Sequence, residues 1–325
     1  MSQASEYRHI PVLVDEVLES LNVKADGDYI DCTLGGGGHA CAVLRKLGPQ
    51  GRFFGLDQDN DALAAATVRI HQMNPAADWQ LASGNFTDLE AQMDRIGWAE
   101  ADGILADIGV SSWQIDQPER GFTFRQEGPL DMRMNQNAPM TAADIVNTAG
   151  EDDLVRILRD FGEERHARRI SHAIVARRQQ SPFRTTTDLA DLIIRAMPSS
   201  SRREEQHPAR RTFQALRIEV NGELAALQSL LDCAPRRLRP HGRLVIITFH
   251  SLEDRLVKAA FRKLENPCTC PRSFPVCICG LKPLGHVVHK RGLTAGAEEI
   301  SRNPRAASAR VRCFERLTEE EEANG

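Results

Sequence analysis

The chain has 325 residues, of which 41% are hydrophobic and 26% are charged. This length allows one large domain or two ordinary ones, and no stretch approaches the roughly 18 apolar residues that a membrane-spanning helix needs. The N-terminus lacks a basic start followed by an apolar run, so no secretory signal is expected. We therefore expect a cytoplasmic protein that has no membrane partner.

The net charge of −4 is distributed unevenly along the chain. Residues 156–217 carry 14 Arg, no Lys and 7 acidic side chains, and residues 281–316 carry 8 basic side chains against 3 acidic ones. Basic segments in an otherwise acidic chain favour a polyanionic partner. Solvated helix faces or internal ion pairs would give the same pattern. The candidates that we single out for RNA contacts are Arg202, Arg203, Arg210 and Arg211.

The first part of the chain alternates between helical and extended patterns. The expected elements are a helix over 11–21 that opens at Pro11, a strand over 29–33, glycines 35–38, a helix over 39–47, a strand over 52–57, a helix over 59–73, and strands over 79–82 and 103–108. A strand, a glycine loop, a helix and a second strand form a βαβ unit, which feeds a parallel sheet. The sequence therefore predicts a doubly wound α/β fold.

This alternation stops at about residue 115 and resumes near residue 217. The expected elements here are helices around 153–161, 165–178 and 187–197, one long helix through 213–231, a strand over 243–249, and a helix capped by Ser251 and Asp254. We predict a discontinuous core of residues 1–114 and 217–325, with a helical insertion of residues 115–216 that recognises the substrate. The acidic tail 319–322 is expected to be disordered.

The glycine run is the first candidate site. Glycines between a strand and a helix allow a sharp turn and a close approach of the backbone to a ligand. Asp57 lies 20 residues beyond Gly37 at a predicted strand end, where its carboxylate can accept hydrogen bonds from ribose hydroxyls. These residues predict a nucleoside cofactor, but they fit NAD as well as S-adenosylmethionine.

Three carboxylates end predicted strands: Asp31, Asp57 and Asp107. Ligands of open α/β sheets bind outside the carboxyl ends of the strands. A helix cap would explain any one of these residues, but it explains all three poorly. We therefore expect them to line one crevice.

Several blocks resemble a known family. The run from Asp31 to His39, Asp-Cys-Thr-Leu-Gly-Gly-Gly-Gly-His, is similar to the RsmH (MraW) family. Further blocks follow in that family's order over nearly the whole chain: Asp107 to Ser112, Arg120 to Phe124, Pro129 to Met134, Arg211 to Ile218, Phe249 to Arg255, and Asn303 to Arg305.

The resemblance implies a class I, Rossmann-like methyltransferase that uses S-adenosylmethionine to methylate the N4 amine of a decoding-centre cytidine in 16S ribosomal RNA. It implies 16S rRNA or the 30S subunit as the partner, and leaves monomer and homodimer both open. The cofactor-binding residues that it implies are Gly37, Gly38, His39, Asp57, Phe86, Asp107 and Gln114.

Asp107 is also the candidate catalytic residue. Other amino-methyltransferases commonly carry an Asp/Asn/Ser-Pro-Pro-aromatic block after the fourth strand, whereas this chain has Asp107-Ile-Gly-Val there. A carboxylate that accepts a hydrogen bond from the cytosine amine would favour methyl transfer. An NAD-dependent oxidoreductase and a non-catalytic RNA-binding assembly factor are the rival hypotheses.

Four cysteines, Cys268, Cys270, Cys277 and Cys279, lie within twelve residues. A zinc knuckle is one interpretation, although the Cys-x-Cys spacing is tighter than the usual two-to-four-residue spacer. Reduced loop cysteines without a metal fit equally well, so no metal ligand is assigned from the sequence.

Overall fold

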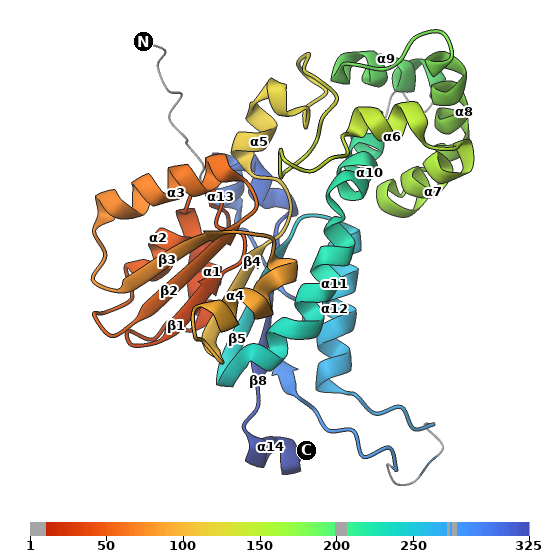
Figure 1. Cartoon of the computed structure of the whole chain (residues 1–325). Coiled ribbons are helices and arrows are strands. Elements are labelled where there is room, and N and C mark those ends of the chain that lie inside the picture. The colour runs from red at the N-terminus through yellow and green to blue at the C-terminus, as the bar shows by residue number, and fades with distance from the viewer. Residues whose placement is uncertain (1–10, 199–206, 272–273, 275–277, 325) are drawn as a thin grey trace. The chain divides into compact units, whose positions relative to one another are not determined.

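The computed structural model describes residues 11–198, 207–271, 274 and 278–324 (Figure 1). The chain forms two compact units: a core unit of Met1–Gly109 and Leu224–Gly325, and an insertion unit of Val110–Glu223. The sequence places the boundaries after residues 114 and 216, whereas the units divide after residues 109 and 223. None of the described helices combines the length and apolar character needed to cross a bilayer.

Within the described residues, the core unit forms an eight-stranded sheet in the order β3-β2-β1-β4-β5-β8-β6, with β7 also paired to β8. Strands β1 to β5 are parallel, and β8 runs antiparallel to β5. The strands are β1 (Asp28–Asp31), β2 (Arg52–Asp57), β3 (Asp78–Ser83), β4 (Ala101–Asp107), β5 (Leu238–Thr248), β6 (Gly285–Val287), β7 (Leu293–Thr294) and β8 (Arg310–Arg316). The strand order reverses between β1 and β4, which is where ligands of such sheets bind.

Helices cover both faces of this sheet (Figure 1). Phe53 and Leu105 pack on one face with α1, α2 and α3, and the adjacent residues Phe54 and Ile104 pack on the other face with α4, α11 and α12. The helices are α1 (Val14–Leu21), α2 (Gly38–Leu44), α3 (Asn60–Met73), α4 (Leu89–Arg95), α11 (Glu223–Cys233), α12 (Ser251–Glu265), α13 (Ala297–Arg302) and α14 (Glu319–Asn324). Strand residues that are apolar on both faces are typical of a doubly wound sheet, and this prediction is confirmed.

Two predictions for the ends of the core unit are wrong. The first helix does not open at Pro11 but at Val14, because Leu13 adopts a left-handed conformation with φ 53°. The acidic tail forms α14 rather than a disordered segment. The Thr318 hydroxyl accepts from the Glu321 backbone N–H at 3.2 Å, and the Glu321 carboxylate accepts from the Thr318 N–H at 2.9 Å. This reciprocal cap stabilises the helix start.

The insertion unit is helical, as expected from the loss of strand patterning. Its helices are α5 (Ser112–Asp116), α6 (Ala142–Thr148), α7 (Glu151–Gly162), α8 (Ala167–Arg178), α9 (Thr186–Ala196) and α10 (Arg210–Asn221). Leu154, Ile170 and Phe213 belong to one buried apolar cluster, so α7, α8 and α10 share a hydrophobic core. This core is separate from the two clusters on the sheet faces.

The predicted long helix through 213–231 is wrong, because two helices occupy this segment. Gly222 has a φ of +59° and caps the C-terminal end of α10, and α11 begins at the next residue. The left-handed conformation is readily available to glycine and ends the helix. The apolar spacing continues across the break, so periodicity alone does not reveal it.

Candidate cofactor and catalytic site

The glycine loop joins β1 to α2. Gly35 and Gly37 have positive φ angles of +50° and +73°, which glycine adopts without strain. A Cβ atom at Gly37 would lie 3.2 Å from the Cβ of Ala66 in α3, and one at Gly38 would lie 2.8 Å from Cγ of Pro11. The loop therefore needs glycine for its turns and for its close packing against the neighbouring segments.

Asp57 ends β2 and holds the glycine loop against it. Its Oδ2 accepts a hydrogen bond from the Gly35 N–H at 2.7 Å, and its Oδ1 accepts one from the Asp59 N–H at 2.8 Å. Burial raises the pKa of Asp57 to about 6, although these backbone donors favour the ionised form. Each carboxylate oxygen has a second lone pair, so Asp57 can still accept a hydrogen bond from a ligand.

Thr33 connects the ends of β1 and β4. Its backbone N–H donates to Asp31 Oδ1 at 3.1 Å, and its hydroxyl oxygen accepts from the Asp107 N–H at 2.5 Å. Asp31 Oδ2 and Asp107 Oδ1 are buried without a hydrogen-bond partner among the described residues. The structure thus brings Asp31 and Asp107 together, as expected. Thr33 was not predicted, because a threonine after a strand is common in sequences.

The carboxylates of Asp31 and Asp107 share a buried, negatively charged environment. Burial is the main cause that raises the pKa of Asp31 to about 7 and that of Asp107 to about 8. The negative charges of Asp57 near Asp31, and of Asp31 and Glu253 near Asp107, act in the same direction. His39 Nε2 lies 3.8 Å from Asp107 Oδ2, and the imidazole is nearly buried. A cationic ligand would relieve this unfavourable burial of negative charge.

Glu253 is a further buried carboxylate of this region. Its Oε2 accepts hydrogen bonds from the Phe249 N–H at 2.8 Å and the His250 N–H at 3.2 Å, and its Oε1 lies 2.9 Å from His250 Nε2. These contacts form the cap of α12. The predicted cap by Ser251 and Asp254 is wrong, because the cap residue is one position earlier.

The resemblance assigns Phe86 and Gln114 to the cofactor pocket. Phe86 is buried in the hydrophobic cluster that lies between the sheet and α4, α11 and α12. Gln114 lies in the insertion unit, where its side-chain oxygen accepts from the Ser111 N–H at 3.0 Å within the capping box of α5. Both side chains thus have structural roles, and their contacts with a cofactor stay predictions.

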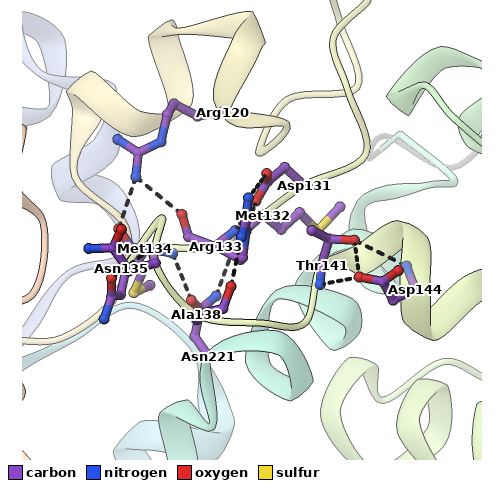
Figure 2. Close-up of polar contacts among 11 residues, drawn as sticks. Arg120, Asp131, Met132, Arg133, Met134, Asn135, Ala138, Thr141, Asp144 and Asn221 are labelled. Carbon is purple, nitrogen blue, oxygen red and sulfur yellow. Dashed lines mark hydrogen bonds and ion pairs between the residues drawn. The ribbon is translucent and has the colours of Figure 1, made fainter.

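Polar contacts in the insertion unit fix the loop that precedes α6 (Figure 2). The buried Arg120 donates to the carbonyl oxygens of Arg133 at 3.1 Å and Met134 at 3.0 Å. Arg133 forms a bidentate pair with Asp131 at 2.8 and 2.7 Å and donates to the carbonyl of Ala138 at 2.6 Å. These charged groups are therefore engaged in holding the loop itself.

Met132 lies at the centre of this loop with an unusual backbone conformation. Its φ is +64°, and its side chain is buried in the insertion core. The Asn221 amide donates to the Met132 carbonyl at 2.8 Å and accepts from the Met134 N–H at 2.8 Å (Figure 2). A left-handed conformation costs energy in a residue other than glycine, and these bonds offset that cost.

The arginines of the insertion unit differ in their exposure and in their partners. Paired ones include Arg177, which contacts Asp188 at 3.0 Å, and Arg178, which donates to the Val146 carbonyl at 2.8 Å. Exposed ones include Arg165, Arg168, Arg169, Arg184 and Arg210. Of the four candidates for RNA contacts, Arg202 and Arg203 lie outside the described residues, and Arg211 donates to the Glu163 carbonyl at 3.4 Å.

Comparisons with known proteins agree with the geometry of the core unit. Residues 6–317 match the model of the MraW methylase family. The chain is 50% identical over 317 residues to a protein of Symbiobacterium thermophilum, and the aligned residues make up 98% of this chain and 99% of the relative. It is 51% identical over 314 residues to a protein of Carboxydothermus hydrogenoformans, covering 96% and 99% of the two chains. Both relatives are named ribosomal RNA small subunit methyltransferase H.

These matches confirm the resemblance and resolve the choice that the glycine loop and Asp57 left open. A methylase family requires a methyl donor, so the nucleoside cofactor is S-adenosylmethionine rather than NAD. The chain belongs to the MraW methylase family and is an S-adenosylmethionine-dependent methyltransferase with a Rossmann-like core.

Proposed function

We propose that this chain methylates the N4 amine of a decoding-centre cytidine in 16S ribosomal RNA, on the 30S subunit in the cytoplasm. The names of the relatives support small-subunit rRNA as the substrate. The resemblance of the sequence blocks supports the choice of base and atom. The observation that carries a methyl-transfer site is a pair of buried carboxylate oxygens, on Asp31 and Asp107, at the ends of adjacent parallel strands. Neither oxygen has a hydrogen-bond partner among the residues that the structure describes.

The chain's own residues fit the cofactor. S-Adenosylmethionine supplies an electrophilic methyl group on a positively charged sulfonium, and it also carries an ammonium group. Asp31 and Asp107 provide buried acceptors of the opposite charge. Asp57 has remaining acceptor capacity for a ribose. We assign the other contacts to Gly37, Gly38, His39, Phe86 and Gln114.

Asp107 is also proposed as the catalytic residue. The lone pair of a cytosine amine is delocalised into the ring, so the amine is a weak nucleophile. The ionised Asp107 carboxylate would accept a hydrogen bond from the amine and would stabilise the positive charge that develops on nitrogen. The high pKa of Asp107 makes this carboxylate a better proton acceptor than an ordinary aspartate.

The insertion unit is proposed to bind the RNA. Arg168 and Arg169 in α8 and Arg210 in α10 are exposed, whereas the charged groups of its internal loop already have partners. Exposed arginines can contact phosphates without disturbing the unit's core. These arginines support the proposal that the insertion unit recognises the substrate.

The test is transfer of a labelled methyl group to 30S subunits and to naked 16S rRNA by the purified chain. We expect incorporation into one cytidine of the 30S subunit, located by mass spectrometry of nuclease fragments. Binding of both cofactor and 30S subunits without incorporation would favour the non-catalytic assembly factor. Incorporation at a carbon or a different base would contradict the proposed chemistry.

A further inference from the structure

Cysteines of the core unit occupy two different environments. Cys32, Cys41 and Cys313 are buried, and burial raises the pKa of each thiol. Cys268 is exposed and Cys270 is half-buried, in the connection between α12 and β6. The three buried cysteines pack as small apolar side chains. The two cysteines of the connection are not part of a hydrophobic core.

Three of the loop thiols lie close together. The Sγ atoms of Cys268, Cys270 and Cys279 all lie within 4.8 Å of one another. Three thiolates around a tetrahedral zinc ion, with Zn–S bonds of about 2.3 Å, lie about 3.8 Å apart. Only small side-chain movements would bring these sulfurs to that spacing.

A backbone donor is directed at this cluster. The Ile278 N–H donates to Cys270 Sγ at 3.3 Å. Partners of this kind commonly orient and tune metal ligands.

The connection that carries the cluster is long and lies at the surface in its described part. It spans residues 266–284 without regular secondary structure among the residues described there, and the Leu284 N–H donates to the Leu264 carbonyl at its base. Three of its large apolar side chains are exposed: Phe274 by 45%, Ile278 by 73% and Leu281 by 50%. Long loops without a core of their own are uncommon in compact domains, and a bound metal is one way to order them.

We propose that Cys268, Cys270 and Cys279 bind a zinc ion that orders the connection between α12 and β6. Soft thiolate ligands favour Zn²⁺ over hard cations such as Mg²⁺. The three cysteines supply three of the four ligands of a tetrahedral site, and Cys277 lies outside the described residues.

The site is structural rather than catalytic. Helix α12 begins just beyond the carboxyl end of β5 and has 15 residues, so it is about 22 Å long. The cysteines follow its far end, whereas the carboxylates lie at the strand ends near its beginning. Loss of zinc should therefore loosen the loop and leave cofactor binding intact.

The experiment measures zinc in the full-length chain, purified without chelators, by mass spectrometry of the metal. We expect about one zinc per chain in the wild type. Cys268→Ser and Cys279→Ser should each lower zinc affinity by more than the roughly 100-fold that loss of an outer-shell partner can cost. Cys233→Ser, which removes a thiol elsewhere in the core unit, is the matched control and should retain zinc.

Two further readouts distinguish thiolate ligation from adventitious metal and from misfolding. Cobalt-substituted wild type should show thiolate-to-cobalt charge-transfer absorption, which should be weaker in both serine variants. The variants should keep wild-type S-adenosylmethionine affinity and be cleaved faster by trypsin within residues 266–284. Zinc-free wild type after growth with added zinc, or zinc retained in both variants, would overturn the proposal.

Discussion

The charged groups at the strand ends of the core unit differ in their partners from those in the loop that precedes α6 of the insertion unit. At the strand ends of the core unit, Asp31 and Asp107 each keep a buried oxygen that has no hydrogen-bond partner in the part of the chain that the structure describes. In the insertion unit, Arg120 and Arg133 direct their guanidinium groups at carbonyl and carboxylate oxygens of the same loop. An unpartnered buried carboxylate costs stability, whereas a satisfied network fixes one conformation. The difference indicates that the core residues are arranged for a ligand and the insertion residues for rigidity.

The same difference divides the sequence blocks that carry the family resemblance. The block from Asp31 to His39 forms a loop at the carboxyl ends of strands, where a ligand can bind. The block from Pro129 to Met134 forms the strained loop around Met132, and its charges are neutralised internally. The family resemblance does not show whether a block binds a ligand or stabilises the fold. The contacts in the structure distinguish these two roles.

The largest expected effect is at Asp107. Asp107→Asn keeps the shape of the side chain but removes the negative charge opposite the reacting amine. Loss of one preorganised electrostatic group typically lowers turnover about 100- to 1,000-fold. The measurement is single-turnover methyl transfer at saturating cofactor and saturating 30S subunits. Asp78→Asn, at the start of β3, is the matched control and should react normally. A near-normal rate in Asp107→Asn would show that this residue only positions the cofactor.

The next effect concerns Asp57. Asp57→Ala should weaken S-adenosylmethionine binding by about 10- to 150-fold, because a charge-assisted hydrogen bond contributes roughly 1.5–3 kcal/mol. The structure adds a second consequence, since the variant also frees the Gly35 N–H that Asp57 holds. Asp57→Asn retains one acceptor oxygen and should lose less affinity. Calorimetry on both variants checks this order, and equal wild-type affinity in both would remove Asp57 from the pocket.

A third prediction concerns pH and the raised pKa values of Asp31 and Asp107. In the unfolded chain, both carboxyl groups have the ordinary pKa of an aspartate, which is lower than their pKa in the folded protein. The unfolded state therefore releases these protons first as the pH rises. Stability of the cofactor-free protein should therefore fall between about pH 4 and about pH 8. The cationic cofactor favours the ionised carboxylates, so its affinity should rise by on the order of tenfold between about pH 6 and about pH 8.

Denaturant unfolding across pH and calorimetry in buffers of different ionisation heat check both parts. Proton release on cofactor binding is expected. Proton uptake, or an affinity that does not change with pH, would contradict the link between these carboxylates and the cofactor. Asp107→Asn provides the control, because the variant lacks one of the two titrating groups. Its cofactor affinity should therefore change less with pH.

Much of the core unit could be predicted from its sequence because strand and turn patterns there agree with burial. The strand over 52–57 has the predicted ends, since apolar residues on both faces are followed by Asp57. Strand β8 was not predicted, because Arg310, Arg312 and Arg316 interrupt its apolar pattern. Arg312 is nevertheless buried, and its Nε pairs with Asp254 at 2.8 Å. Such a pair forms only when distant segments fold together.

The site residues show the same limit. Asp31, Asp57 and Asp107 were predicted together because each ends a strand. Thr33 and Glu253 were missed, because their roles depend on contacts across β1 and β4 and within the start of α12. In the insertion unit, the sequence revealed the richness in arginine but could not separate paired side chains from exposed ones.

The smallest expected effect tests that separation. Arg168→Gln with Arg169→Gln removes two exposed charges from α8, and the unit's core should not change. If both contact phosphates, the log–log salt slope of RNA binding should fall by roughly 1.4–1.8, which is 0.7–0.9 for each contact. The paired control is Arg178→Gln, which loses hydrogen bonds to the Val146 and Ala149 carbonyls. It should lower the melting temperature and leave the salt slope of the folded protein near the wild-type value. Cofactor affinity should be unchanged in both variants, because neither alters the core unit. If the slope falls in the control but not in the double variant, the insertion unit binds RNA through a surface other than these exposed arginines.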